Sequence, residues 1–340
     1  MSKRAAPTTS TGNPTTATKK NKVTQTAQYF GSAGAFSHVA AEKYFKAARI
    51  DVALSPSSNL STLFDAVSSS SVDYCIVPYE NSISGTISST IVQLLMHPNL
   101  HIVGEMLDAD ELCLCTAPNA QLSDIKTVMS HSHLLQQSGV FLKTLPNTIA
   151  CEPTFDSASA CAAVGTDVSK AAIASRRAAE AHGLAVLSKN FADTESETRY
   201  VILAHKSNPA AKSSSHRLGR RCTVSYVLAN RAGAMFKSLS CFAFRDLSII
   251  KVSTVPLGGF LNSGSSGSSS SSDSNGSSTA NRWDYVFVVD FIASANDAVN
   301  TAALEALKEF ANSVRILGEY SAAEMRGESP SKNMHHLAAF

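Results

Sequence analysis

Glu80, Asn81 and Ser82 stand together where a short apolar run meets a segment rich in serine and threonine. The run from Tyr74 to Val77 predicts a buried strand, and Pro78 should end it because proline lacks a backbone donor. Ligands of open α/β sheets bind just beyond the carboxyl ends of strands, and the N–H groups of a following helix attract anions. We therefore expect either an anion-binding group here or a turn whose polar side chains only cap the next helix.

Three further segments carry polar side chains where an expected strand meets a loop or helix. These residues are Ser37 and His38, then Ser130, His131 and Gln137, and finally Thr198 and Arg199. The glycines before Ser37 lack the dinucleotide-binding spacing G-x-G-x-x-G, so that loop alone indicates little more than affinity for an anion. Taken one at a time, Thr198 and Arg199 fit an ordinary surface threonine and a solvent-facing cation.

Five segments, in this order, resemble the successive motifs of the prephenate dehydratase family: GSAGAFSHVAAEKYF, DYCIVPYENSISGTISST, SHSHLLQQSGVFL, AAIASRRAAEAHGLAVL and ETRYVIL. The resemblance covers about residues 28–205. Further on, CTVSYVLANRAGAMFKSLSCFAF resembles the start of the ACT regulatory domain that commonly follows. Ordered motifs are far more specific together than any one of them alone.

The resemblance implies that prephenate loses carbon dioxide and water to give phenylpyruvate on the route to phenylalanine. It also implies two α/β lobes of the periplasmic-binding-protein type with the site between them. Because hydroxide leaves poorly, the reaction needs a proton donor at the ring hydroxyl and a water-poor site that holds a dianion. No cofactor or metal is implied, and the chain has no H-E-x-x-H, Walker or paired C-x-x-C pattern.

The family motifs imply roles for residues of this chain. Thr198 matches the threonine of a T-R-F motif and should assist departure of the hydroxyl, while Arg199 either lies in the site or braces the strand. Asn81, in the E-N-S motif, should donate to a substrate oxygen. The acid stays open, because a carboxyl such as Glu80 is intrinsically a far better proton donor than a hydroxyl. The other implied substrate-binding residues are Ser37, Ser82, Ser130, His131, Gln137 and Ser157.

In the ACT part, the resemblance implies that phenylalanine binds at a dimer interface. The implied effector-binding residues are Asn230, Gly233, Ala234 and Met235. The second effector motif is poorly kept, because Ser253, Thr254, Val255 and Pro256 stand where the family has E-S-R-P. Two interpretations remain open: a structural or dimer-forming domain, or one with weakened or altered effector binding.

The substrate is also open between two close analogues. Ala35 stands where bacterial enzymes usually have threonine and where plant relatives that act on arogenate have alanine, whereas His38 follows the bacterial and fungal form. Arogenate carries an amino group in place of the side-chain keto group, so one or two pocket groups can decide between them. We rank prephenate first and arogenate second, with a non-catalytic anion-binding sensor fused to ACT as the alternative of another class.

Composition agrees with a two-domain enzyme. The chain has 340 residues, is 44% hydrophobic and carries a net charge of +2, which indicates no bias toward nucleic acid or membrane. Seven scattered cysteines favour a reducing compartment. We expect a cytoplasmic homodimer or homotetramer, with plastid import as the alternative, because a threonine- and lysine-rich start without acidic residues also suits a transit peptide.

The expected organisation follows from alternating strand and helix patterns. Its parts are a disordered tail (1–27), the catalytic domain (28–205), a linker (206–220), an ACT domain (221–321) with a serine-rich insertion at about 260–281, and a C-terminal tail (322–340). The first domain should contain mostly parallel α/β sheet, and the second the ferredoxin-like β-α-β-β-α-β arrangement of an α+β fold. Its third strand alternates strictly, which predicts one buried face made by Trp283, Tyr285, Phe287, Val289 and Phe291.

Overall fold

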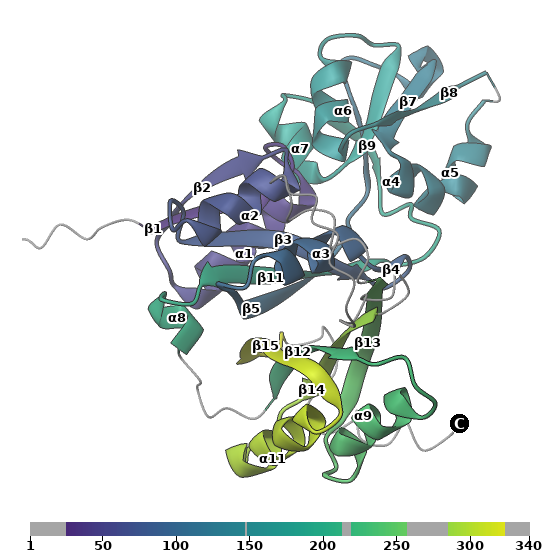
Figure 1. Ribbon diagram of the computed structural model, residues 1–340. Helices are drawn as coiled ribbons and strands as arrows, with labels where there is room; N and C mark the ends of the chain where they lie inside the picture. The colour runs from purple at the N-terminus through teal and green to yellow at the C-terminus, as the bar shows by residue number, and fades with distance from the viewer. Residues whose placement is uncertain (1–24, 147, 213–218, 257–284, 324–340) are drawn as a thin grey trace, which may run out of the picture.

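The computed structural model describes residues 25–146, 148–212, 219–256 and 285–323. Its strands form three sheets, two in an upper pair of lobes and one in a C-terminal domain below them (Figure 1). The expected tails and the serine-rich insertion lie almost wholly outside the described residues, as does Trp283. The N-terminal tail was expected to reach residue 27, but strand β1 already begins at Gln25.

The first lobe is a sheet packed between helices, with strand order β2-β1-β3-β11-β5 and the short β4 beside β3. Its strands are β1 (Gln25–Phe30), β2 (Val52–Ser57), β3 (Tyr74–Asn81), β4 (Gly85–Thr86), β5 (Leu100–Ala109) and β11 (Glu197–His205). Its helices are α1 (Phe36–Ala48), α2 (Leu60–Ser68), α3 (Ser88–Met96) and the short α8 (Pro209–Lys212). Helix α1 packs on one face of the sheet, and α2 and α3 pack on the other.

Helix α2 shows how the sequence specifies one of these elements. The side chain of Asn59 accepts a hydrogen bond from the backbone N–H of Thr62 at 3.1 Å, which satisfies a donor that the helix start would otherwise leave free. Leu63, Phe64 and Val67 then fall on one side of the helix and are fully buried against the sheet. A capped start and one apolar face therefore dock this helix in a single orientation.

The second lobe is a smaller sheet with order β10-β6-β9-β7-β8. Its strands are β6 (Cys113–Thr116), β7 (Thr127–His131), β8 (Ala150–Thr154), β9 (Lys170–Ala174) and β10 (Ala185–Lys189). Its helices are α4 (Ser132–Gln137), α5 (Gly139–Thr144), α6 (Ser157–Val164) and α7 (Arg176–Ala181), with a 3-10 turn at Leu122–Asp124. Cys113 and Cys115 lie in one apolar cluster of this lobe, so the two positions share a buried face.

The sheets of both lobes are mixed, so the prediction of mostly parallel strands was wrong. In the first lobe β1 pairs in parallel with β2 and β3, but β11 pairs antiparallel with both β3 and β5. The reason is that the chain leaves the first lobe after β5 and returns from the second lobe only at β11. The chain returns at the edge of the sheet where β5 ended, so β11 runs in the opposite direction to β5 and β3.

The C-terminal domain has strand order β13-β14-β12-β15 with every pairing antiparallel. Its elements are β12 (Arg220–Leu228), α9 (Ala234–Ala243), β13 (Ile249–Pro256), β14 (Tyr285–Ile292), α11 (Asp297–Lys308) and β15 (Ala311–Ser321). This confirms the ferredoxin-like prediction. The last helix ends at Lys308, and β15 begins three residues later at Ala311.

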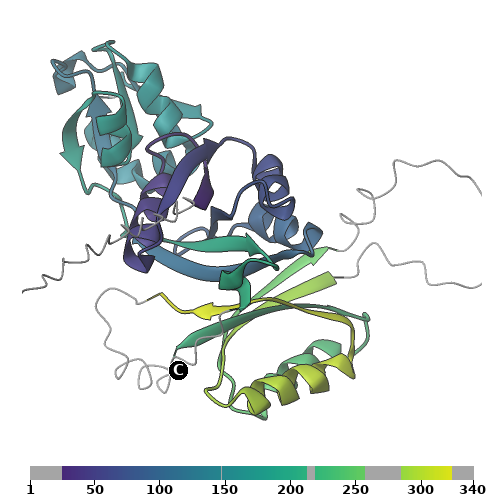
Figure 2. The same ribbon diagram turned by 90° about the vertical axis from the view of Figure 1, so that its left-hand side faces the viewer.

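Both faces of this third sheet are covered. Helices α9 and α11 lie on the face away from the lobes (Figures 1 and 2), where Phe287, Val289 and Phe291 contact them as the alternation predicted. The opposite face packs on the first lobe, where Val288 and Leu317 join the same apolar cluster as Ile102 of β5. The expectation of a single buried face was therefore incomplete, because a second domain occupies the other.

Candidate active site

A cavity of about 400 Å³ lies between the two lobes. Strand ends of the first lobe contribute Asn81 and Thr198, and the start of α1 contributes Ser37. The second lobe contributes polar groups from the ends of two strands and the start of α6. They are His131, His133, Asp156 and Ser157. Residues 81 and 198, which are distant in sequence, therefore meet at one edge of a sheet, as ligand sites of α/β folds do.

Four polar side chains form a connected cluster in the wall of this cavity. The amide nitrogen of Asn81 donates to the Thr198 hydroxyl at 3.0 Å and to the Ser196 hydroxyl at 2.8 Å. Thr198 and Ser196 in turn donate to a carboxylate oxygen of Asp110 at 3.1 and 2.7 Å. The amide oxygen of Asn81 accepts the backbone N–H of Ile83 at 3.0 Å, which fixes which end of the amide points at Thr198.

A β-bulge explains why Asn81 and Thr198 share a face. The two residues pair across β3 and β11, but the register shifts between Arg199 and Tyr200, where Tyr79 is the extra residue in β3. A bulge places two residues opposite one and re-aims the side chains that follow it. Asn81 consequently faces the cavity beside Thr198, while Arg199, the next residue of β11, faces the opposite side of the sheet.

Glu80 does not line the cavity, so the structure does not bring it together with Asn81 and Thr198 as the motif had implied. Its carboxylate lies 3.4 Å from the guanidinium of Arg199 and 3.1 Å from the ammonium of Lys251, on the side of the C-terminal domain. The prediction assumed that the strand ends at Pro78, whereas β3 continues through Pro78 to Asn81. Because the bulge comes just before Glu80, simple alternation gives the wrong face for this residue.

Arg199 braces the strand, which was one of its two predicted alternatives. Its guanidinium donates to Glu105 at 2.8 Å, to Asp290 at 2.7 Å and to the hydroxyl of Tyr320 at 2.8 Å. Glu105 belongs to β5, whereas Asp290 and Tyr320 belong to β14 and β15 of the C-terminal domain. The residue next to Thr198 therefore joins the first lobe to the C-terminal domain through buried, charged hydrogen bonds.

Asp110 was missed by the sequence analysis. It lines the cavity directly after β5, and burial raises the pKa of its carboxyl to about 6, against the opposing hydrogen bonds from Ser196 and Thr198. A signal was available, because Asp108, Asp110 and Glu111 follow an apolar run that predicts a strand. Asp110, like Asn81, therefore lies where an apolar strand ends.

The remaining predicted residues divide into those at the cavity and those near it. Ser37, His131 and Ser157 line it, and Gln137 reaches the cluster through a hydrogen bond to the Ser196 hydroxyl at 3.1 Å. The other two do not line it, contrary to expectation. Ser130 is fully buried and donates to the carbonyl of Ile173 at 2.6 Å, and the Ser82 hydroxyl accepts the backbone N–H of Glu197 at 3.0 Å. Both hydroxyls hold the ends of strands that carry site residues.

The predicted effector residues surround a smaller cavity of about 140 Å³ in the C-terminal domain. Asn230, Ala234 and Met235 line it, and Gly233, the residue before α9, has a φ of 76°. Ser253, at the degraded motif, instead lies 3.3 Å from the hydroxyl of Thr86 in the first lobe. This part of β13 therefore contacts the lobe below the active-site cavity.

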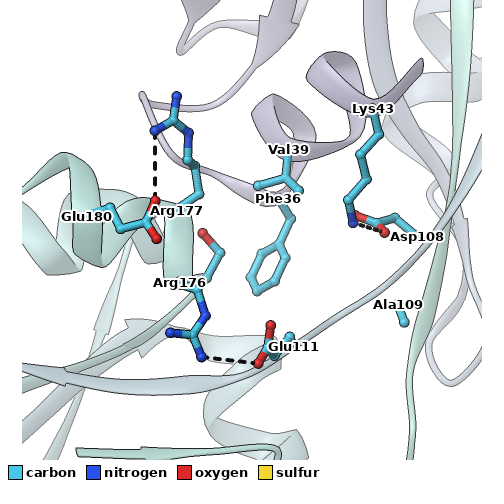
Figure 3. Close-up of a pocket in the computed structure, with 10 residues that line it drawn as sticks. Phe36, Val39, Lys43, Asp108, Ala109, Glu111, Arg176, Arg177 and Glu180 are labelled. Atoms are coloured by element: carbon cyan, nitrogen blue, oxygen red, sulfur yellow. Dashed lines mark hydrogen bonds and ion pairs between the residues drawn. The ribbon is translucent and has the colours of Figure 1, made fainter. Parts of the chain in front are cut away.

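A second cavity marks the seam between the lobes (Figure 3). Arg176 and Arg177 of α7 form ion pairs with Glu111 at 3.6 Å and with Glu42 of α1 at 2.8 Å, and Lys43 pairs with Asp108. The two arginine pairs join α7 of the second lobe to α1 and to the segment after β5, whereas the Lys43–Asp108 pair lies within the first lobe. The relative position of the lobes, and so the width of the active-site cavity, depends on this seam.

Gly34 leaves no room for a side chain against α7, and replacing it by alanine should lower kcat/KM by about 100-fold, because displacing reacting groups by about 1 Å has an effect of this size. Its φ is +85°, and a Cβ there would lie 2.5 Å from the Cα of Ala178 in α7. Gly183→Ala is the matched control, since its φ is +65° with nothing within 4 Å of an added Cβ. Steady-state kinetics of both variants provide the measurement; equal losses would show that backbone strain alone, and not the seam, is responsible.

Comparison with known proteins agrees with this geometry. The sequence model described as prephenate dehydratase matches residues 27–208, which is more than half of the chain. The chain belongs to the prephenate dehydratase family. The enzyme named arogenate dehydratase/prephenate dehydratase 2, chloroplastic, from Arabidopsis thaliana is 32% identical over 295 residues, which cover 86% of this chain and 71% of the relative. The family is thus one of carbon-oxygen lyases.

Two solved structures show the same fold. One is prephenate dehydratase from Arthrobacter aurescens in complex with L-Phe, with a TM-score of 0.72 and 23% identity over 88% of this chain and 90% of that one. The other is described as a quorum quenching acylase, with a TM-score of 0.71 and 23% identity over 88% of this chain and 98% of that one. At this identity the likeness concerns the fold, and activity has to be argued from the site.

Within the described residues, no helix is long and apolar enough to cross a membrane. In the same part of the chain, no three His, Cys, Asp or Glu side chains gather as a metal site would require.

Proposed function

We propose that this enzyme converts prephenate to phenylpyruvate by loss of carbon dioxide and water. The observation that carries the proposal is the hydrogen-bonded group of Asn81, Thr198 and Asp110 in a cavity between two lobes that belong to the prephenate dehydratase family. Residues 28–205 are assigned to catalysis and 221–321 to an ACT-type regulatory domain. Ser37, His131 and Ser157 at the cavity are the proposed contacts to substrate oxygens.

The cavity suits this elimination because it brings donors together and limits water. Phe30, Phe36 and Phe155 supply apolar surface of the cavity, and hydroxyl and amide groups supply polar surface. In a site of low dielectric, preorganised donors stabilise charge that develops on a leaving oxygen more strongly than water does. Thr198 is the proposed group at the leaving hydroxyl, and Asn81 holds its oxygen in place from 3.0 Å.

Arogenate is the second candidate substrate. Ala35, at the position where the family resemblance separates bacterial enzymes from plant enzymes acting on arogenate, lies in the cavity wall. The Arabidopsis relative carries both activities in its name. Because the two substrates differ only in an amino or a keto group, the discrimination rests on few contacts.

A side-by-side assay of prephenate and arogenate with the purified chain tests the proposal. Formation of ultraviolet-absorbing phenylpyruvate from prephenate, at a kcat/KM above that for arogenate, is the expected result. A higher kcat/KM for arogenate would reverse the ranking. Binding of prephenate without turnover of either compound would indicate that the protein is a sensor and not an enzyme.

Phenylalanine is the proposed effector of the C-terminal domain, with weakened affinity. The small cavity beside Asn230 and Met235 offers a site, and a structure of similar fold was solved with L-Phe. At the place of the E-S-R-P motif, however, Val255 is part of the core and Ser253 contacts Thr86 of the first lobe. We expect phenylalanine to inhibit only well above micromolar concentrations in a calorimetric and kinetic titration, and a micromolar response would contradict the importance given to the lost motif.

Self-association through the C-terminal domain is proposed on its exposed apolar groups. Phe236 and Phe244 of the α9 region are 74% and 81% exposed, and β13 is an edge strand with Ile250 and Val252 exposed. Large exposed aromatic groups beside an open strand edge are typical of an interface. A cytoplasmic homodimer or homotetramer is the proposed form, with plastid import as the alternative because the Arabidopsis relative is chloroplastic by name.

A further inference from the structure

Asp110 is the carboxyl group that stands beside Thr198 in the cavity. One of its oxygens, Oδ2, accepts from Ser196 at 2.7 Å, from Thr198 at 3.1 Å and from Asn81 at 3.3 Å. Within the part of the chain that the structure describes, the other oxygen, Oδ1, has a single hydrogen-bond contact, of 3.3 Å to the Thr198 hydroxyl. Since a carboxyl oxygen can engage more than one partner, Oδ1 retains capacity for a proton or a ligand.

The charged groups closest to Asp110 are paired with one another. On its own segment, Asp108 pairs with Lys43 of α1, and Glu111 pairs with Arg176 of α7 at 3.6 Å (Figure 3). Lys43 and Arg176 are therefore engaged by other carboxylates. Among the described residues, no cation forms an ion pair with Asp110.

The other ionisable groups of the cavity are also committed or neutral. Asp156 caps α6 and accepts from Ser32, while burial lowers the pKa of His133 and raises that of Tyr200 far above its ordinary value. His131, at the cavity rim, is exposed and its ring accepts the backbone N–H of His133. Burial, assisted by the negative charge of Asp108, raises the pKa of Asp110 to about 6, in the range where a carboxyl can hold or release a proton near neutral pH.

The proposed reaction consumes a proton that some group must supply. In the prephenate dianion, the C–C bond to the ring carboxylate breaks and its electron pair enters the ring, while the C–O bond to the ring hydroxyl breaks. The products are carbon dioxide, an aromatic monoanion and hydroxide, and the hydroxide takes one proton to leave as water. A threonine hydroxyl is too weak an acid to be the source, whereas a carboxyl is strong enough.

We propose that Asp110 supplies this proton, transferring it from its carboxyl group to the hydroxyl that departs beside Thr198. The carboxylate left behind regains a proton from solvent once the products leave. Thr198 then positions both the leaving oxygen and Asp110 through hydrogen bonds. This inference rests on the proposed function and answers the question of the acid, which Glu80 cannot satisfy from the opposite face of β3.

The role predicts how rate depends on pH. The protonated carboxyl is the active form. Because kcat/KM reports ionisation of the free enzyme, kcat/KM should be constant below about pH 6 and fall about tenfold per pH unit above it. A bound dianion opposes ionisation of a neighbouring carboxyl. The decline in kcat, which reports the complex, should therefore lie at higher pH than the decline in kcat/KM.

The decisive variant is Asp110→Asn, which keeps the shape and accepting oxygen but carries no acidic proton. We expect kcat for prephenate to fall by about 100- to 10,000-fold and the decline of kcat/KM above pH 6 to disappear. Rates are measured from pH 5 to 9 with the uncatalysed rate subtracted at each pH. Far-ultraviolet circular dichroism and the thermal midpoint of the same samples establish that the variant is folded.

Asp108→Asn is the matched control, because it removes one carboxylate two residues away that already pairs with Lys43. It should keep the rate at low pH and shift the decline to lower pH, since one negative charge near Asp110 is lost and Lys43 is released. A second readout needs no turnover: calorimetry of phenylpyruvate binding at pH 7 in two buffers should show proton uptake in the wild type and none in Asp110→Asn.

Separate outcomes identify separate failures. If Asp110→Asn keeps its kcat within twofold, or loses rate while the decline above pH 6 remains, Asp110 is not the acid. If the variant gains activity on prephenate and loses it on arogenate, the carboxylate binds an ammonium group and the inference is overturned. If the wild type turns over neither substrate, it is the proposed function that fails.

Discussion

Replacing Thr198 by alanine should lower kcat by about 100- to 1,000-fold, the usual effect of removing one preorganised donor from an active site. Thr198 is only 7% exposed and its hydroxyl bridges Asn81 and Asp110, so loss of the hydroxyl removes the link between the leaving oxygen and both partners. Folding should lose only about 1 kcal/mol, the value of an ordinary hydrogen bond. Initial rates with saturating prephenate measure the effect.

Thr198→Ser is the control for this prediction. Serine keeps the hydroxyl at the same place on β11 and removes a methyl group, so most of kcat should be retained. An alanine variant that is folded and turns over at the wild-type rate would remove Thr198 from the mechanism. Equal losses in the serine and alanine variants would indicate packing instead of hydrogen bonding.

The second large effect concerns Asp290, and replacing it by alanine should destabilise the protein by about 3–5 kcal/mol. Asp290 is fully buried and accepts from the guanidinium of Arg199 at 2.7 Å. It belongs to a buried cluster that contains as many carboxylates as cations. The members are Glu80, Glu105 and Asp290 with Arg199, Arg221 and Lys251. Removing Asp290 leaves this cluster with one positive charge more than it has carboxylates, which costs far more than the loss of an exposed pair would.

Glu305→Ala provides the comparison. Glu305 pairs with Lys308 at 2.7 Å, the same distance, but both side chains are more than half exposed on α11. Its loss should change stability by less than about 1 kcal/mol. Urea and thermal midpoints of the two variants measure the difference. Similar midpoints would mean that the buried cluster contributes no more than a surface pair.

The sequence predicted the fold well wherever local pattern decides structure. The alternation from Tyr285 to Phe291 and the ferredoxin-like order of the C-terminal domain follow from periodicity. The strand directions of the lobes did not, because the return of the chain at β11 is a long-range event that no local window reports. The second buried face of β14 was missed for the same reason, since its covering surface comes from another domain.

The site was predicted in part. Motif resemblance selected Asn81 and Thr198, whose amide nitrogen and hydroxyl lie 3.0 Å apart. It also placed Glu80 on the cavity side of β3, where the structure does not have it, and it did not select Asp110. One unpaired residue, Tyr79, accounts for the first error, because a bulge inverts the alternation that follows it. The second error has a different origin, since the hydrogen bonds that join Asp110 to Asn81, Ser196 and Thr198 connect segments far apart in the chain.

The location of Arg199 limits how far the catalytic part can be treated as a separable module. One peptide bond joins it to Thr198, and its partners Asp290 and Tyr320 lie in the C-terminal domain. A chain cut before residue 219 would expose this guanidinium together with apolar side chains such as Ile102 and Val201, which now share a core with Val288. Exchanging this domain between relatives should therefore succeed only when the acceptors of Arg199 are transferred with it.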